Sequence, residues 1–514
     1  MGIAALNSSC GLSAHPVGWT SLFEGCGGLP AWSSGDVRGP VARRTYQPVT
    51  GRSGRNRPYA QMLTSSLVTR GEKTRMVDQA TKSGDIESAT MRKVTWRLVP
   101  FLMLCYFIAY LDRVNVGFAG ATMRTDLDLS ATAFGGAAGI FFLAYFFFEV
   151  PSNLALNRFG ARRWIARIMF TWGIISGAQA FVQGELSFNI VRLLLGIAEA
   201  GFFPGIIFYL TLWFPTAYRA RIVGWFMFAI PISTVIGAPI SGLVLGLEGV
   251  AGLHGWQWMF LLEAVPALIM TFAVLYYMTD RPIEARWLEP QQREWLQSRL
   301  DHEKDQRERI LDMSWLRSMM DWRVIALGLV YMGANIPQYG LSFFLPQIVK
   351  AFGVSNVTAG FITAVPYLVG AIGMIVWGLH SDRTGERKWH AVIAFLCIIA
   401  GLGLASVVDD PTVKMMFLCV AGFGFFAVLP IFWTFPTAFL SGAGAAAGIA
   451  AVNSIGNLGG YFGPQVFGLL RDHTGTDVAG LMFLAGCAFV GMMIVLLIGY
   501  NSAISRNLAA SKAG

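Results

Sequence analysis

The chain has 514 residues, of which 54% are hydrophobic and only 13% are charged, with a mean hydropathy of +0.53. Soluble domains carry about 25% charged residues, so a soluble globular fold is excluded. Most of the net charge of +9 lies in residues 1–75, which hold nine Lys and Arg against three acids, so the charge does not indicate nucleic-acid binding. The six cysteines have no ligand spacing, and we expect neither a metal site nor a disulfide framework.

Residues 1–75 are rich in Gly, Ser, Pro and Arg and contain no sustained apolar run. We interpret them as a non-native or disordered leader, although an organellar transit peptide has a similar composition. A start at Met76 would leave a polar, basic N-terminal segment over residues 76–96 that enters the first apolar run.

Twelve apolar runs follow, each near the 20 residues that cross about 30 Å of hydrocarbon as a helix. Charged residues dominate the stretch 279–322, which predicts a cytoplasmic linker with amphipathic helical pieces, and 502–514 would form a cytoplasmic tail. The expected fold is therefore all-α and polytopic, with two six-helix bundles over 97–278 and 323–501. The predicted spans are 97–118, 131–154, 164–183, 187–212, 221–247 and 256–278, then 323–347, 357–380, 389–409, 412–436, 444–470 and 477–501.

The short loops predict the orientation. With the N-terminus inside, inner loops carry nine Lys and Arg residues and outer loops carry four. Positive charge favours the cytoplasmic side, and an even number of spans returns the C-terminus to that side. Both termini are therefore expected in the cytoplasm.

The two halves also resemble each other. NRFGARRW, beginning at Asn157, matches SDRTGERKW, beginning at Ser381, and LWFPT at 212 matches FWTFPT at 432. Several matches at nearly one spacing indicate an internal duplication, and such repeats around a central site are typical of transporters.

Six charged residues interrupt the spans of the first half, where burial of an ion in lipid is costly. Asp112 and Arg113 are adjacent, so they point about 100° apart on a helix and each needs its own partner or water. Arg192 and Glu199 lie seven residues apart, on one face but about 10.5 Å apart along the axis. The set is Asp112, Arg113, Glu149, Arg192, Glu199 and Glu263.

Several motifs resemble known transporters. GLHSDRTGER (378–387) and its degenerate partner NLALNRFGARR (153–163) resemble the cytoplasmic signature of the major facilitator superfamily. YLDRVNVGFA, FEVPSNLALNRFGARRWI, RLLLGIAEAGFFPGIIFYLTLWFP and GWQWMFLLEAVPA resemble its anion:cation symporter branch, which includes tartrate, phthalate, 4-hydroxyphenylacetate, hexonate and hexuronate permeases. The resemblance covers about residues 90 to 500 and implies uptake of an organic anion coupled to protons.

The resemblance implies roles for residues of the first half. Asp112 and Glu199 would couple protons, Arg113 would hold the substrate anion, and Arg192 would act as a charge switch. Structural ion pairs are the alternative for these charges. Tyr145 would contact substrate, and a cytoplasmic latch would comprise Glu149, Arg158, Asp382, Arg383 and Arg387.

The second half has neutral residues where the first half is charged, since Asp112 shifted by the repeat spacing falls on Asn335. It would therefore supply hydrogen bonds and aromatic walls to the substrate. The residues expected to do so are Asn335, Gln338, Tyr339, Trp433, Asn453 and Asn457.

The sequence thus predicts proton-coupled uptake of a tartrate-like hydroxy acid or an aromatic carboxylate by alternating access. We expect a monomer in the lipid bilayer of a bacterial inner membrane, driven by a proton gradient, with no cofactor and no nucleic-acid partner. An enzyme is disfavoured, because no HExxH, GxSxG or P-loop motif occurs. The alternative is an anion exchanger or an exporter on the same fold, and GAPISG (237–242) partly resembles a motif of efflux antiporters.

Overall fold

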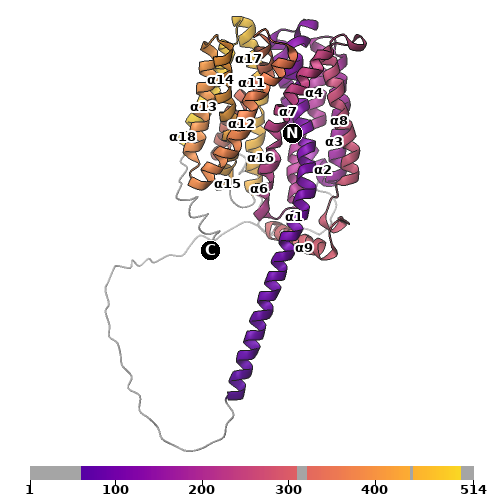
Figure 1. Cartoon of the computed structure of the whole chain (residues 1–514), viewed down its shortest axis with the longest axis vertical. Coiled ribbons are helices and arrows are strands. Elements are labelled where there is room, and N and C mark those ends of the chain that lie inside the picture. Colours follow the sequence, from indigo (N-terminus) through magenta and orange to yellow (C-terminus); the bar gives the residue numbers. More distant parts are fainter. Residues whose placement is uncertain (1–58, 309–320, 440–443, 499–514) are drawn as a thin grey trace, which may run out of the picture. The chain divides into compact units, whose positions relative to one another are not determined.

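The computed structural model describes residues 59–308, 321–439 and 444–498 (Figure 1). Met1–Glu72 form one unit and Lys73–Gly514 a second, and the second contains all of the predicted spans. The first helix, α1 (Tyr59–Asp126), begins before Met76. The predicted tail at 502–514 and most of the predicted leader lie outside the described residues.

The described residues form helices and no strand, which confirms the all-α prediction. Short breaks divide several spans into two helices. The first half holds α1, α2 (Ala131–Phe159), α3 (Ala161–Ala178), η1 (Gln179–Phe181), α4 (Glu185–Glu199), α5 (Phe202–Thr211), α6 (Thr216–Met227), α7 (Ala229–Val244), η2 (Leu245–Leu247), η3 (Val250–Gly252) and α8 (Gly255–Tyr277). The linker region holds η4 (Pro282–Glu284) and α9 (Pro290–Glu308). The second half holds α11 (Trp322–Lys350), α12 (Asn356–Thr384), α13 (Lys388–Val407), α14 (Pro411–Phe432), α15 (Thr434–Phe439), α16 (Gly444–Asn457), α17 (Gly459–Thr474) and α18 (Val478–Leu497).

Ten helical segments within the described residues are long and apolar enough to cross a membrane. The two other predicted spans fall on α3, which has 18 residues, and on α16 with α17, which are separate helices that meet near Leu458. The count of twelve spans therefore stays a prediction.

Serine caps begin two of the helices, and a glycine marks one of the breaks. Ser130 and Ser355 accept hydrogen bonds from backbone N–H groups in the first turns of α2 and α12, as N-caps do. Gly201 separates α4 from α5 with φ of +84°, and a Cβ there would clash with the Ser152 side chain. Only glycine fits this left-handed position, and the break leaves Glu199 as the last residue of α4.

The two halves form two bundles that meet mainly through α2 against α17 and α7 against α12 (Figure 1). We call the end where α1 finishes and α2 starts the hairpin end, and the end where α8 leads into α9 the linker end. Small residues let the backbones touch near the hairpin end. A Cβ on Gly468 would clash with the Ala131 carbonyl, and one on Gly135 would clash with the Pro464 carbonyl.

Polar contacts join the halves at the same end. The Asp472 carboxylate accepts hydrogen bonds from the backbone N–H of Ala131 at 2.9 Å and of Thr132 at 2.7 Å, at the start of α2. The Gln347 side-chain oxygen accepts from Arg124 at 3.0 Å and from Arg471 at 3.1 Å. The halves are therefore held together at the hairpin end.

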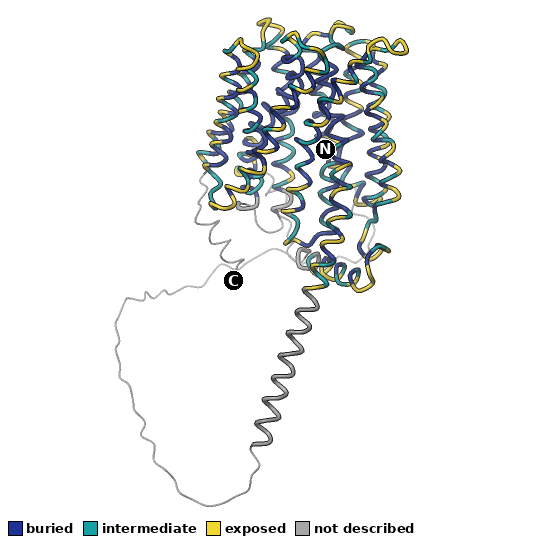
Figure 2. The backbone as a smooth tube through the Cα atoms, in the orientation of Figure 1, coloured by how far each residue is buried: buried dark blue, intermediate teal, exposed yellow. Residues whose placement is uncertain are grey.

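The residues of α1 and α11 become more exposed toward the linker end. Residues 105–120 of α1 and 333–349 of α11 are almost all buried on every side, whereas 92–104 and 322–329 alternate between buried and exposed. Figure 2 shows exposed positions at the bundle ends and on outward faces, with buried positions gathered between. The bundle is closed at the hairpin end and more open at the linker end.

Candidate substrate and proton site

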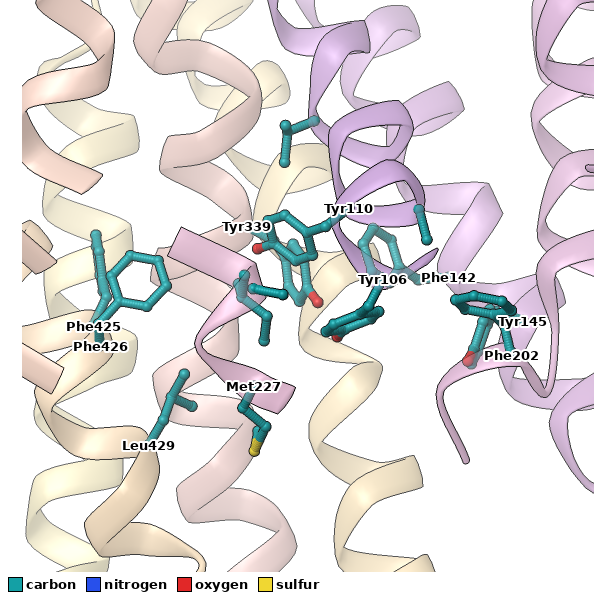
Figure 3. Packing of buried hydrophobic residues seen from close by; sticks show 14 of the residues in the cluster. Tyr106, Tyr110, Phe142, Tyr145, Phe202, Met227, Tyr339, Phe425, Phe426 and Leu429 are labelled. Carbon is teal, nitrogen blue, oxygen red and sulfur yellow. The ribbon is translucent and has the colours of Figure 1, made fainter. Parts of the chain in front are cut away.

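A pocket lies between the two halves, near the middle of α1 and α11. It holds about 570 Å³ of space between atoms, counting the solvent at its mouth. Figure 3 shows Tyr106, Tyr110 and Tyr339 gathered between the halves, with Met227 and Leu429 toward the lower edge of the view. The lining residues are Tyr106, Tyr110, Arg113, Phe142, Tyr145, Phe203, Met227 and Ile230 from the first half, and Tyr331, Asn335, Gln338, Tyr339, Leu429, Asn453 and Asn457 from the second.

Arg113 is the charged group in this lining. Its guanidinium donates a hydrogen bond to the Glu199 carboxylate, and the residue as a whole is 8% exposed. Aromatic rings flank it, with the Arg113 Cζ 5.3 Å from the Phe141 ring centre, 5.8 Å from Phe142 and 5.5 Å from Tyr145. Such rings stabilise a cation without occupying its N–H groups. Arg113 is thus a cation at the pocket wall with donors to spare for a ligand.

Glu199 lies behind Arg113, outside the pocket lining, and is completely buried. Its second oxygen has no hydrogen-bond partner among the described residues. A buried carboxylate with one oxygen unsatisfied is costly, so the pair depends on the Arg113 charge. Removal of either charge would leave the other group without its ion-pair partner.

Asp112 points away from the pocket, toward α3. Its carboxylate accepts hydrogen bonds from the Trp172 indole N–H at 2.7 Å and from the Ser176 hydroxyl. The side chain is 1% exposed. The adjacent charges Asp112 and Arg113 therefore contact different helices, as expected from their 100° separation.

Arg192 lies in α4, seven residues before Glu199, and is fully buried. It donates to the carbonyls of Ala137 and Ala138 at 3.3 Å each, and its Nη1 has no partner among the described residues. It interacts electrostatically with both Asp112 and Glu199. The position of Arg192 would let it respond to the charge on either carboxyl.

The second half contributes neutral polar groups, as the repeat comparison predicts. Asn335 donates to the Gly456 carbonyl at 3.0 Å, and Gln338 donates to the Tyr110 hydroxyl of the other half at 3.4 Å. Seven of the eight residues predicted to bind substrate line the pocket. Trp433 is the exception, since it packs beside the Tyr331 ring at 5.2 Å and is outside the lining.

The predicted latch residues divide between two places. Arg387, just before α13, forms an ion pair at 2.6 Å with Asp382 in the last turn of α12, which also holds Arg383. Arg158 lies over the Phe159 ring at the end of α2. Glu149 is apart from these loops.

Glu149 accepts a hydrogen bond from Asn453 of the second half at 3.2 Å, beside the pocket. An ion pair between Glu149 and Arg158 does not occur among the described contacts. Glu149 therefore joins the two halves near the pocket in this conformation.

Sequence reasoning missed several aromatic lining residues. Tyr106, Tyr110 and Arg113 follow the i, i+4, i+7 pattern of one helix face, and Tyr331, Asn335 and Tyr339 follow i, i+4, i+8. The predicted charges and amides therefore already marked the faces of α1 and α11 that carry these tyrosines.

Comparison with known proteins identifies the family. The model of the Major Facilitator Superfamily matches residues 102–464, and the chain belongs to this superfamily of membrane transporters. A protein of Agrobacterium vitis named "Putative tartrate transporter" is 51% identical over 82% of this chain and 93% of its own length. A "Quinolone resistance transporter" of Acinetobacter baumannii is 40% identical over 80% of this chain and 96% of its own length.

Solved structures show the same fold at low sequence identity. The xylose transporter XylE from E. coli aligns with a TM-score of 0.62 and 14% identity, over 79% of this chain and all of that chain. A bacterial homologue of the human lysosomal transporter Spinster aligns with a TM-score of 0.62 and 16% identity, over 80% of this chain and 97% of that chain. The expected transporter fold is thereby confirmed.

Proposed function

We propose that this protein takes up a small organic anion together with protons, with tartrate as the first substrate to test. The relatives named for tartrate transport support the substrate class, since two of them are 51% and 50% identical over most of this chain. The pocket chemistry supports it independently. It offers one guanidinium and several hydroxyl and amide groups, which suit a dicarboxylate that carries hydroxyls better than a bulky aromatic acid.

The observation that carries the coupling proposal is the Arg113–Glu199 pair at the pocket wall. A substrate carboxylate and the Glu199 carboxylate would compete for the same guanidinium. Protonation of Glu199 would neutralise that competitor and free Arg113 for the anion. The proton and the anion therefore favour each other's binding, which is the thermodynamic requirement of a symporter.

Asp112 would hold a second proton in this scheme. It has no direct contact with Arg113, and its interactions with Arg192 extend its influence toward Glu199. Arg192 would compensate whichever carboxyl is ionised. When both acids are neutral, Arg192 would keep its bonds to the α2 carbonyls, and the site would be ready for the anion.

The positive-inside bias assigns the linker end to the cytoplasm in this proposal. The conformation described above, closed at the hairpin end, would then face the cytoplasm. Opening of the hairpin end would expose the pocket to the periplasm, where protons and anion bind. The relatives in bacteria support an inner-membrane location.

An exporter or an anion exchanger on the same fold is the second candidate. The relative named "Quinolone resistance transporter" is the observation that favours the exporter. An exchanger would move anion against anion without net proton movement. Whether a proton gradient or an internal anion drives transport therefore separates the symporter from the exchanger.

Labelled tartrate uptake into proteoliposomes tests the proposed function. We expect accumulation driven by an inward proton gradient without any internal anion. Uptake that ignores the proton gradient and needs internal anion would support the exchanger instead. The double variant Arg113→Ala/Glu199→Gln should lose uptake. Both residues are changed so that no unpaired carboxylate is left buried. As a control, Arg92→Ala, at an exposed position of α1, should transport normally.

A further inference from the structure

Glu263 is a buried carboxyl outside the pocket. It lies in the third turn of α8 and is 5% exposed. Its carboxyl accepts a hydrogen bond from Asn115 of α1 and one from Ser241 of α7 at 3.2 Å. Glu263 lies nearer the hairpin end of the first half, whereas Glu149 lies nearer the linker end.

Glu263 has no cation partner among the described residues, unlike Glu199. On α1 the charged residues near Asn115 are Asp112, a like charge one helical turn before it, and Arg113, whose guanidinium pairs with Glu199 of α4. On the packed helix α3 the nearest cation in sequence is Arg167. That residue lies ten positions, or about 15 Å of helix, before Gly177, which packs beside Ala264.

The remaining elements packed on α8 add no charge near Glu263. α7, η1 and η2 contain no charged residue, and His254 precedes Glu263 by nine residues, or about 13.5 Å along the helix. Burial of a carboxylate without a cation partner is unfavourable, so the neutral acid is the favoured form here.

Asn115 supplies a second observation for a neutral acid. Its side-chain oxygen is buried with no hydrogen-bond partner among the described residues. The oxygen and nitrogen of an amide can exchange places by a flip. The Asn115 oxygen would then occupy the position that contacts the Glu263 carboxyl, and a protonated Glu263 would donate its O–H to it.

Both partners of Glu263 border the contacts that close the hairpin end. Ser241 precedes Gly242, whose backbone packs against Asn356 and Gly360 of α12. Asn115 lies two residues before Gly117, which packs against α11. Separation of the halves at this end would admit water beside the carboxyl and stabilise its charged form.

We propose that Glu263 is a further proton-binding site, protonated while the hairpin end is closed and open to proton exchange when that end opens. The inference rests on the alternating access of the proposed function, but it does not depend on which anion is carried. It assigns a proton to the first half in addition to those on Asp112 and Glu199.

Infrared spectroscopy of the full chain in lipid vesicles, without substrate, tests the proposal. At about pH 7, where ordinary carboxyls are ionised, we expect a carbonyl-stretch band of a protonated acid that Glu263→Gln removes. Glu263→Asp should restore such a band. Glu248→Gln, at an exposed carboxyl before α8, should leave it unchanged. Equal protonated-acid band intensity in the wild type and in Glu263→Gln would overturn the site.

The link to opening has its own arm. A Gly468→Leu side chain cannot fit against Ala131 in the closed form. We expect the Glu263 band to weaken at about pH 7 in this variant, because water reaches the carboxyl. An unchanged band would overturn the link to opening. Because no anion is added, both infrared comparisons remain informative even if the protein does not carry tartrate with protons.

Discussion

Glu199→Gln tests the competition between the carboxylate and the substrate for Arg113. The change keeps the size and one hydrogen-bond acceptor of the side chain but removes its charge. Two unit charges about 4 Å apart interact by about 4 kcal/mol at an effective dielectric of 20. In the wild type, the anion must replace part of the Arg113–Glu199 attraction when it binds. We assign about 1.4–2.8 kcal/mol to this loss, which the variant does not incur. This corresponds to about 10- to 100-fold tighter binding by the variant near neutral pH.

Calorimetric titration of the purified protein with tartrate measures this effect. Wild-type affinity should rise as the pH falls and Glu199 is protonated, whereas the affinity of Glu199→Gln should be high and nearly independent of pH. Tartrate should also raise the melting temperature of the variant more than that of the wild type, because the anion pairs with a buried Arg113 that has lost its partner.

Glu185→Gln is the matched control, because Glu185 lies in the same helix, α4, but is exposed. It should keep the wild-type affinity and pH dependence. Weaker tartrate binding by Glu199→Gln, or an unchanged pH dependence, would refute the competition and return the pair to a structural role.

Two further variants test the closed end and the α12–α13 loop. Gly468→Leu should abolish tartrate uptake into vesicles, because its side chain meets the Ala131 carbonyl and the hairpin end cannot close; normal uptake would contradict the described packing. Burial raises the pKa of Glu386, but hydrogen bonds from the backbone N–H of Trp389 and from the ring and N–H of His390 outweigh it, so the net pKa lies below its ordinary value. The carboxylate therefore stabilises the fold above its unfolded pKa of about 4.3, and this is lost as the pH falls through the lower folded value. Glu386→Gln should lower stability by about 1 kcal/mol at neutral pH, as loss of a helix cap does, and a melting-temperature deficit that persists at about pH 2 would contradict this.

The hydrophobic pattern predicted the helices well because lipid burial requires long apolar segments, and each predicted span falls on a helix of the structure. It did not predict the breaks within spans. The one at Gly201 depends on a tertiary contact with Ser152, which is distant in sequence. The break at Gly201 makes Glu199 the last residue of α4, which the hydrophobic pattern alone did not predict.

The site was predictable in its residue types but less so in its pairings. Charges inside spans are costly wherever they occur, so Asp112, Arg113, Arg192 and Glu199 stand out from the sequence alone. The choice of partner depends on which helices are neighbours, and the pairing of Asp112 with α3 is not encoded in its local sequence. Glu263 shows the same limit, since its isolation from cations is visible only in three dimensions.

Trp433 shows how a break in a helix affects a predicted contact. The repeat comparison placed it in the wall of the pocket, but α14 ends at Phe432 and Trp433 lies in the break before α15. Its ring packs beside the ring of Tyr331, which lines the pocket, and a substrate contact of Trp433 stays a prediction.

Proton movement during tartrate uptake tests the central claim most directly. Tartrate added outside proteoliposomes that hold no internal anion should make the weakly buffered external medium more alkaline, as protons enter with the anion. The Arg113→Ala/Glu199→Gln variant should show neither tartrate uptake nor a pH change. Tartrate entry by the wild-type protein without any change in external pH would contradict proton-coupled uptake.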